Sequence, residues 1–418
     1  MSDTFRSLFS AQRATIGGAS SGSGGSATDP AAASREVRPD AMPGAVIRVL
    51  GAGGGGTNAV SRMVKGKVQG VEFIAANTDI QALYTNPAAR KITMGRGTTR
   101  GLGAGANPQI GERAAQESLE EIKAAIEGTD MLFITAGLGG GTGSGSIPVI
   151  AELARSLGIL TVAVVTKPFS FEGLKRRKQA VDALENLRGK VDTLITIPND
   201  KILSLIDKTT PLTEAFEVVD EVLQHAIEGI SGLITQPGLV NVDFADVKSI
   251  MQDAGTALMG IGYGTGDSRA AEAARAAIDS PLLELSISGA KGILFNITGG
   301  NDLSMFEVDE AARIITETAD PEANIIFGTV IEENFAGQVK CTVIATGFEE
   351  QTETATLATG TPAQRYLSGK PVPTTRPPVA ETHHKEDRAN PDAPRSTPQQ
   401  FNEEELEVPA FMRKPLGK

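Results

Sequence analysis

The sequence is poor in the residues that build disulfide frameworks and metal centres. Its 418 residues include one cysteine, Cys341, and three histidines, of which His383 and His384 lie together in a proline-rich polar stretch. A disulfide framework and a cysteine-based zinc module are therefore excluded, and a histidine-ligated metal has few candidates. Tryptophan is absent, and aromatic residues make up only 4% of the chain.

A net positive charge and a long apolar run are also missing. The formal charge is −12, which argues against nucleic acid as the main partner because no overall positive field attracts phosphate backbones. The longest apolar runs, such as residues 159–165, are far too short to span a bilayer, and the N-terminus lacks the hydrophobic region of a secretory signal. We expect a cytoplasmic protein with no direct membrane insertion.

Glycine, by contrast, is abundant at 47 residues, and it is clustered. Apolar β-branched runs alternate with helical patterns, which is typical of a mostly parallel α/β sheet. The expected strands are 45–50, 71–76, 131–135, 159–166 and 193–197, then 292–298, 324–331 and 339–345. The expected helices are 58–64, 109–127, 147–157, 175–187 and 212–234, then 245–258, 269–278 and 306–319.

Composition and pattern divide the chain into six parts. A serine- and glycine-rich start and a long Pro/Thr-rich stretch near the end show no period and favour disorder. The predicted parts are a disordered arm (1–44), a nucleotide-binding α/β domain (45–210), a central helix (211–238), a smaller α+β domain (239–348), a flexible linker (349–402) and a C-terminal peptide (403–418).

Two glycine-rich turns each follow a predicted strand and precede a predicted helix. The first, Gly51–Gly56, matches G-x-G-x-x-G, where glycine lets backbone N–H groups approach a phosphate at a helix N-terminus. Alone it fits a dinucleotide site, another phosphate site or a simple tight turn. The second turn, Gly137–Gly145, favours a triphosphate, with Gly101–Asn107 as a third wall. Because no P-loop lysine motif occurs, backbone dipoles and a metal ion, Mg²⁺, are expected to meet the phosphate charge.

The second turn resembles the tubulin signature G-G-G-T-G-[ST]-G, and the rest of residues 45–348 resembles FtsZ, the family of bacterial tubulin homologues that act in cell division. The stretches that carry this resemblance are FIAANTDIQAL (73–83), RGLGAGANP (100–108), TVAVVTKPF (161–169), IPND (197–200) and NVDFADV (241–247). The resemblance implies a tubulin/FtsZ-type fold with a Rossmann-like GTPase domain, a long central helix and a smaller C-terminal domain. It also implies a GTPase that binds GTP or GDP with Mg²⁺ and polymerises head to tail.

The resemblance implies phosphate contacts from three loops. The residues so implied are Gly53, Gly54, Gly55, Gly56, Ala104, Gly105, Ala106, Asn107, Gly139, Gly140, Gly141, Thr142 and Gly143, with Asn77 and Asp79 near the phosphates and the water shell of the metal. No residue is expected to ligate the metal directly.

For the sugar and base, the same resemblance implies roles for Glu172, Arg176, Asn58, Asn199, Phe216 and Asp220. Glu172 would bind the ribose, with Arg176 close by, although spacing alone favours an i,i+4 surface pair. Phe216 would stack on the base, and the carboxylate of Asp220 would accept from the N1–H and amino group of guanine. Periodicity alone instead places Phe216 in the core stripe and Asp220 on a solvated face.

The acidic stretch Asn241–Asp246 carries the catalytic assignment. Locally it reads as helix capping, with Asp243 as N-cap and Asp246 at the third helical position. The resemblance implies instead that Asp243 and Asp246, with Asn241 beside them, enter the nucleotide site of the next subunit and polarise the attacking water. Both roles are compatible, since capping would hold the carboxylates in place.

Near the end of the chain, Glu407–Lys414 resembles the terminal peptide of FtsZ proteins, which implies that residues 403–414 bind membrane tethers and ring regulators such as FtsA, ZipA, SepF or MinC. A frayed terminus is the alternative. The implied place of action is the mid-cell division ring. Two other functions stay open at this stage. One is a Rossmann oxidoreductase that uses Gly51–Gly56 and Glu72; the other is an FtsZ-like scaffold that assembles without hydrolysing nucleotide.

Overall fold

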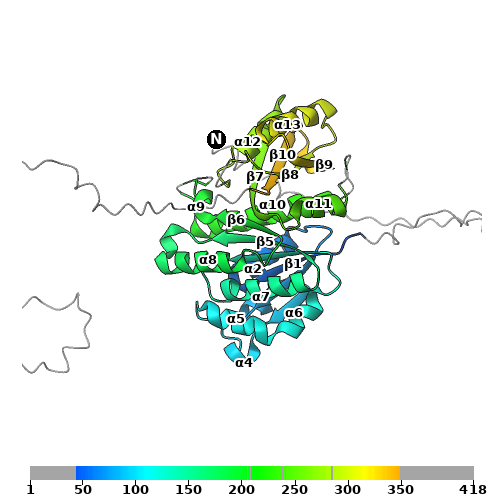
Figure 1. Cartoon of the computed structure of the whole chain (residues 1–418). Coiled ribbons are helices and arrows are strands. Elements are labelled where there is room, and N and C mark those ends of the chain that lie inside the picture. The colour runs from blue at the N-terminus through cyan, green and yellow to red at the C-terminus, as the bar shows by residue number, and fades with distance from the viewer. Residues whose placement is uncertain are drawn as a thin grey trace, which may run out of the picture. The chain divides into compact units, whose positions relative to one another are not determined.

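The structure, a computed structural model of the chain, describes residues 44–348 apart from residues 205, 208, 237–239, 241 and 284–285. Ten strands form one sheet in the order β3-β2-β1-β4-β5-β6-β7-β10-β8-β9 (Figure 1). The strands are β1 Ile47–Ala52, β2 Glu72–Asn77, β3 Arg90–Thr93, β4 Met131–Gly137, β5 Leu160–Lys167, β6 Thr193–Pro198, β7 Gly255–Thr265, β8 Gly292–Gly299, β9 Asn324–Ile331 and β10 Gln338–Thr346.

The helices of the first half cover both faces of its sheet. They are α2 Gly53–Lys65, α3 Ile80–Tyr84, α4 Arg96–Thr99, α5 Pro108–Glu117, α6 Leu119–Ile126, α7 Thr142–Ser156, α8 Leu174–Leu187, α9 Asn199–Ile202 and α10 Leu212–Thr235, with a 3₁₀ turn η3 at Ser170–Glu172. The helices of the second half are α11 Phe244–Met251, α12 Arg269–Ile278 and α13 Met305–Thr318, with η4 at Glu333–Phe335.

Strand alternation divides the core of the parallel half into two layers. Odd-numbered residues of β1 and β4, such as Val49 and Phe133, pack with α2, α10 and α11 on one face. Even-numbered residues, such as Leu50 and Ile134, pack with α5, α6, α7 and α8 on the other. Because both faces are covered by helices, the central strands β4 and β5 are buried along nearly their whole length, as is typical of parallel sheets.

The sheet changes character at β7. Its first residues pair parallel with β6, and the strand then runs on to pair antiparallel with β10. Helices α12 and α13 pack on β8 and β10 in a third core cluster that includes Cys341. The long helix α10 also contacts β8 and β9, so it belongs to the packing of both halves.

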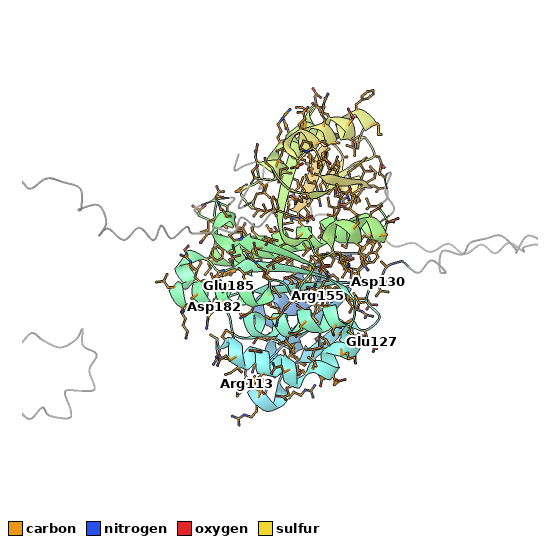
Figure 2. The ribbon with its side chains drawn as sticks, viewed as in Figure 1. Arg113, Glu127, Asp130, Arg155, Asp182 and Glu185 are labelled. Atoms are coloured by element: carbon orange, nitrogen blue, oxygen red, sulfur yellow. The ribbon has the colours of Figure 1, made fainter. Side chains whose placement is uncertain are left out.

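The start of the parallel sheet is fixed by polar contacts at the amino ends of its strands. The backbone N–H of Val46 donates to Asp130 Oδ2 (2.7 Å), and Arg48 donates to the carbonyl of Glu127 (2.7 Å). Asp130 and Glu127 lie close together in Figure 2. These contacts set the register at which β1 enters the sheet next to β4.

The predicted helix at residues 212–234 is confirmed to within one residue, whereas several other boundaries are wrong. The predicted helix 109–127 is two helices that break at Ser118. Helix α7 starts at Thr142, five residues before its predicted start, and Pro148 lies inside the helix. The helix predicted at 245–258 ends at Met251, and β7 follows at Gly255, because a glycine-rich strand that packs against α12 carries no apolar alternation to read.

Candidate nucleotide site

The glycine turns lie at one edge of the parallel sheet, where the strand order reverses. Strands β2 and β3 lie on one side of β1, and β4, β5 and β6 lie on the other. The turn after β1 opens α2, and the turn after β4 opens α7. A crevice between the carboxyl ends of such strands is the usual ligand site of an open α/β sheet.

The two turns touch each other through their backbones. A Cβ added to Gly53, whose φ is +69°, would lie 2.6 Å from the backbone nitrogen of Gly143. A Cβ on Gly56 would lie 2.3 Å from the carbonyl oxygen of Thr135, whereas Gly54 and Gly140 face open space. The turns therefore form a surface of backbone groups with room above it, which is the geometry that a phosphate chain needs.

The third loop closes on this surface. Gly141 packs against Ala104 and against the backbone of Asn107, and the side chain of Gln179 donates to the carbonyl of Ala106 (3.1 Å). Ala106 has a φ of +57°, and Gly105 has the same value. Asn107 caps α5 by accepting from the backbone N–H of Gln109 (3.0 Å).

The end of β2 brings three polar residues to the same edge. Asn77 Oδ1 accepts from the backbone N–H of Thr78 (2.8 Å), and Asp79 Oδ1 caps α3 by accepting from that of Gln81 (2.9 Å). The hydroxyl groups of Thr78 and Thr142 are 2.6 Å apart. The contact between the Thr78 and Thr142 hydroxyls joins the segment after β2 to the first residue of α7.

The segment after β5 forms the next wall. Glu172 accepts from the backbone N–H of Phe169 (2.9 Å) and forms an ion pair with Arg176, so the predicted i,i+4 pair is present. The ring of Phe169 meets that of Phe216 edge to face, with centroids 5.5 Å apart. This contact joins the first turns of α10 to the loop that carries Glu172.

The two asparagines assigned to the base or ribose lie in different settings. Asn58 is exposed on α2. Asn199, at the end of β6, is buried, and its Oδ1 has no hydrogen-bond partner within the described part of the chain. An unpaired buried acceptor is costly, so this oxygen is well placed to receive a hydroxyl or amino group of a ligand.

Asp220 occupies an unusual electrostatic setting. Burial raises its pKa to about 7, Arg62 opposes the rise, and Glu217 and Glu221 add to it. Asp220 lies four residues after Phe216 on α10, and therefore on the same face of the helix. Phe216 itself is 40% exposed, so it is not part of the buried stripe that periodicity alone would place it in.

The acids assigned to catalysis lie at the other end of α10. Asp243 is the N-cap of α11, where its Oδ1 accepts from the backbone N–H of Asp246 (2.8 Å), so the predicted cap is present. Both side chains are exposed, and Asn241 lies outside the described residues. Between Phe216 and this acidic pair runs most of α10, whose 24 residues span roughly 36 Å at 1.5 Å per residue.

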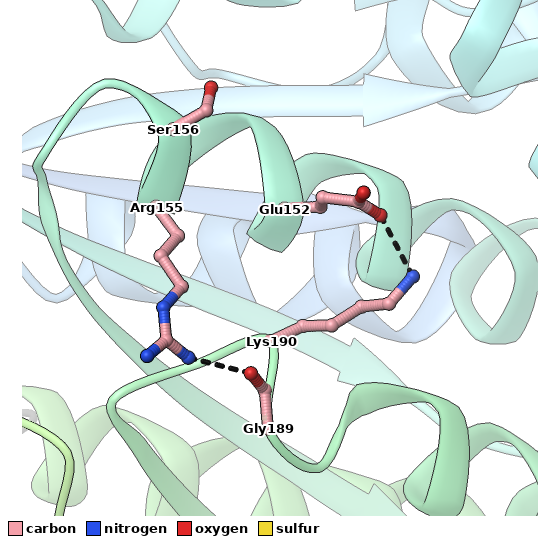
Figure 3. A pocket seen from close by; sticks show the side chains of 5 residues that line it. All are labelled: Glu152, Arg155, Ser156, Gly189 and Lys190. Atoms are coloured by element: carbon pink, nitrogen blue, oxygen red, sulfur yellow. Dashed lines mark hydrogen bonds and ion pairs between the residues drawn. The ribbon is translucent and has the colours of Figure 1, made fainter.

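A surface pocket of about 390 Å³ lies at the far end of α7 from the glycine turns (Figure 3). Its lining includes Glu152, Arg155 and Lys190. Lys190 pairs with Glu152 (2.9 Å), and Arg155 donates to the carbonyl of Gly189 (2.6 Å) and pairs with Asp253 (2.8 Å). Its charges are thus matched within the protein.

Several site residues escaped the sequence analysis. Ser144 accepts from the backbone N–H of Gly139 (2.9 Å) and so fixes the second glycine turn. Asp200 accepts from the backbone N–H (2.8 Å) and hydroxyl (2.5 Å) of Ser170, which holds the turn that bears Glu172. Ser144 could have been found from the hydroxyl in the glycine signature; Asp200 is adjacent to Asn199, but its contact is 30 residues away along the chain.

Comparison with known proteins identifies the family. A model of the tubulin/FtsZ GTPase domain matches residues 46–207, and a model of the FtsZ C-terminal domain matches residues 255–349. A structure of an empty FtsZ dimer from M. jannaschii is 48% identical, covers 72% of this chain and 88% of its own, and superposes with a TM-score of 0.70. The chain belongs to the FtsZ family.

Two further structures agree with this result. A point mutant of FtsZ from M. jannaschii is 48% identical over 73% of this chain and 92% of its own, with a TM-score of 0.71. CetZ2 from Haloferax volcanii, solved as a GTPγS-bound protofilament, is 20% identical over 73% of this chain and 94% of its own, with a TM-score of 0.61, and so shares the fold. As a member of the FtsZ family, the chain is a tubulin-like GTPase that binds GTP and GDP.

The oxidoreductase alternative is wrong. It requires Glu72 at the carboxyl end of the second strand, next to the ribose of a dinucleotide. Glu72 instead begins β2, at the opposite edge of the sheet from the glycine turns, and pairs with Arg48 (2.7 Å). The FtsZ assignment also accounts for the second glycine turn, which a dehydrogenase site leaves unexplained.

Proposed function

We propose that this FtsZ-family protein is the self-assembling GTPase of a cell-division ring, and that it hydrolyses GTP at a site shared by adjacent subunits of a head-to-tail filament. The nucleotide binds in the crevice above the two glycine turns of one subunit. Asp243 and Asp246, with Asn241, come from the next subunit and position the attacking water. Hydrolysis is therefore conditional on assembly.

The observation that carries this proposal is the separation of the two halves of the site within one chain. The glycine turns, Glu172 and Asp220 lie at one end of α10, and the exposed pair Asp243 and Asp246 lies at its other end. A carboxylate has to lie within hydrogen-bond reach of the water that it activates, so in this proposal a second copy supplies the acids. Its capping bond holds Asp243 in one orientation, which prepares the pair for that role.

The phosphate half-site stabilises developing charge with backbone donors. Helices α2 and α7 begin in the two turns, so their first backbone N–H groups are donors for a phosphate, whereas the N–H of Gly139 donates to Ser144. Within the described residues, no group of three His, Cys, Asp or Glu side chains is arranged to hold a metal. Mg²⁺ keeps several waters and binds mainly to substrate phosphates, and the family resemblance assigns Asp79 to its water shell. When bound, Mg²⁺ would neutralise charge on the phosphate oxygens.

The proposal also includes assembly into a filament, a place in the division ring and binding to partner proteins. The FtsZ dimer from M. jannaschii and the CetZ2 protofilament from Haloferax volcanii support self-association. None of the described helices has the length and apolarity needed to cross a bilayer. The family resemblance assigns attachment at mid-cell to tethers or regulators of the FtsA, ZipA, SepF or MinC kind, bound through residues 403–414, which lie outside the described residues.

The decisive experiment separates GTP binding from GTP turnover. Asp246→Ala is expected to bind GTP like the parent protein and to lose turnover, because it removes a water-positioning acid but nothing that holds the nucleotide. Phosphate release is measured above and below the assembly concentration, with Asp253→Ala as a control that removes an exposed aspartate outside the proposed site. Parental turnover by Asp246→Ala, or full-speed turnover by strictly monomeric protein, would refute the shared site.

A further inference from the structure

The helix that would read the base carries three carboxylates around one arginine. Arg62 of α2 lies 3.3 Å from Glu217, 3.8 Å from Asp220 and 3.7 Å from Glu221, all three on α10. The Arg62 side chain is 28% exposed and that of Asp220 is 19% exposed, so the pair is only partly screened by solvent. One arginine thus forms ion pairs with three carboxylates.

Recognition of guanine by Asp220 requires a particular protonation state of its carboxyl group. Its N1–H and its amino group are both donors, and a carboxylate can accept from both only when it is ionised. A protonated Asp220 would present its own O–H to one of those donors and lose the match. The charge state of Asp220 therefore controls base recognition.

We propose that Arg62 is a specificity-determining residue, which keeps Asp220 ionised and so able to accept the two hydrogen bonds of a guanine base. This inference rests on the base-reading role of Asp220 in the proposed function. Arg62 acts through Asp220 and is a positioning residue; it does not itself contact the base. Glu217 and Glu221 oppose the effect of Arg62, because the negative charge of each disfavours ionisation of Asp220.

The charged surroundings of Asp220 determine the pH range in which this control acts. Burial is the largest effect and raises the pKa of Asp220 to about 7. The positive charge of Arg62 is the next largest and lowers this pKa, whereas Glu217 and Glu221 raise it further. The other elements packed on this half of α10 are α9, which carries Asp200 and Lys201, and β5, which ends at Lys167. Asp200 is engaged with Ser170 and lies 3.9 Å from Arg177.

The sign of the effect follows from these groups. Nucleotide binds the ionised form, so affinity rises with pH through about 7 and then levels off. The ionised fraction rises from about one tenth at pH 6 to nearly all at pH 8.5, which corresponds to about tenfold tighter binding. Loss of a unit charge at this distance is worth roughly one pH unit even at high dielectric, so Arg62→Gln should shift the midpoint to about pH 8.

The test is a titration of GDP into the full-length chain by calorimetry between pH 6.0 and 8.5, at fixed ionic strength and below the assembly concentration. Arg62→Gln is expected to bind GDP about fivefold more weakly than the parent at pH 7.0 and within about twofold of it at pH 8.5. Arg62→Lys, which keeps the charge, should retain the parental midpoint. Glu217→Gln should move the midpoint down, opposite to Arg62→Gln.

The outcomes distinguish this inference from the proposed function. A uniform loss of affinity at every pH in Arg62→Gln would show a merely structural arginine and overturn the inference. If Asp220→Asn weakens binding and flattens the pH profile while Arg62→Gln follows the parental curve, the inference alone fails. If Asp220→Asn binds GDP like the parent at every pH, the base-reading role fails, and the inference fails with it.

Discussion

Gly145 is the position where one added methyl group should do the most damage to GTP turnover. It lies in the first turns of α7, where the helix crosses α5 backbone to backbone. A Cβ at this position would lie 1.9 Å from the carbonyl oxygen of Pro108 and 2.6 Å from the backbone nitrogen of Glu112. A second close approach lies nearby, because a Cβ added to Gly111 of α5 would lie 2.3 Å from the carbonyl oxygen of Gly141.

The size of the effect follows from these distances. Real Cβ contacts essentially never fall below 3.0 Å, so Gly145→Ala must move the Pro108 carbonyl by at least about 1.1 Å, from 1.9 to 3.0 Å. The displaced segment begins at Asn107, the N-cap of α5 and the end of the loop to which we assign a phosphate contact. Overpacking of this kind costs about 1–3 kcal/mol, and a 1 Å misplacement of a positioning group costs about 100-fold in rate.

We therefore expect Gly145→Ala to lose about 100-fold in GTP turnover at saturating GTP while its melting temperature falls by several degrees. Phosphate release and thermal unfolding are measured on the same preparation. The matched control is Gly232→Ala in α10, where the nearest atom to the new methyl group is 3.9 Å away. That control should keep parental turnover and gain up to about 1 kcal/mol from helix propensity. Turnover by Gly145→Ala within twofold of the parent, at an unchanged melting temperature, would refute the close-packing argument.

Two further predictions concern stability and recruitment. Burial, followed by the charge of Lys340, lowers the pKa of His225 to about 3. Below pH 6.5 the unfolded chain therefore binds a proton at His225 that the folded chain does not bind, and the free energy of unfolding falls as the pH falls. At pH 5.5 the free energy of unfolding is about 1.4 kcal/mol lower for this reason. Between pH 7.5 and 5.5, measured by urea unfolding, the free energy of unfolding of His225→Gln should therefore fall by about 1.4 kcal/mol less than that of the parent. Equal pH dependence in both proteins would contradict this prediction. Deletion of residues 403–418 should spare GTP turnover and abolish binding to the tether, and an unchanged pull-down would remove the recruitment proposal.

The parallel half of the fold could be predicted from sequence because its signals are local. Buried strands of that half are continuous apolar runs, and the glycine turns mark where strands end and helices begin. The prediction failed where tertiary packing overrides local pattern. Strand β7 has glycines at positions 260, 262 and 264 because the backbone of α12 lies against it, and those glycines hide the alternation.

The site divides in the same way. The meeting of the two glycine turns could be predicted because each turn follows a parallel strand and opens a helix. The capping role of Asp243 could be predicted because a cap and its helix are adjacent. Arg62 could not, since nothing near it in sequence points to α10. Its importance comes from three acids that only the folded chain brings within 4 Å of it.

The reactivity of Cys341 can report local unfolding of the C-terminal half. It is the sole thiol of the chain, it is fully buried on β10, and burial raises its pKa to about 12. A disulfide reagent can therefore consume it only when β10 is exposed, so the rate of that reaction counts opening events without any engineered label. Comparing the rate with and without GDP would measure how firmly an occupied crevice holds a strand in the other half of the sheet.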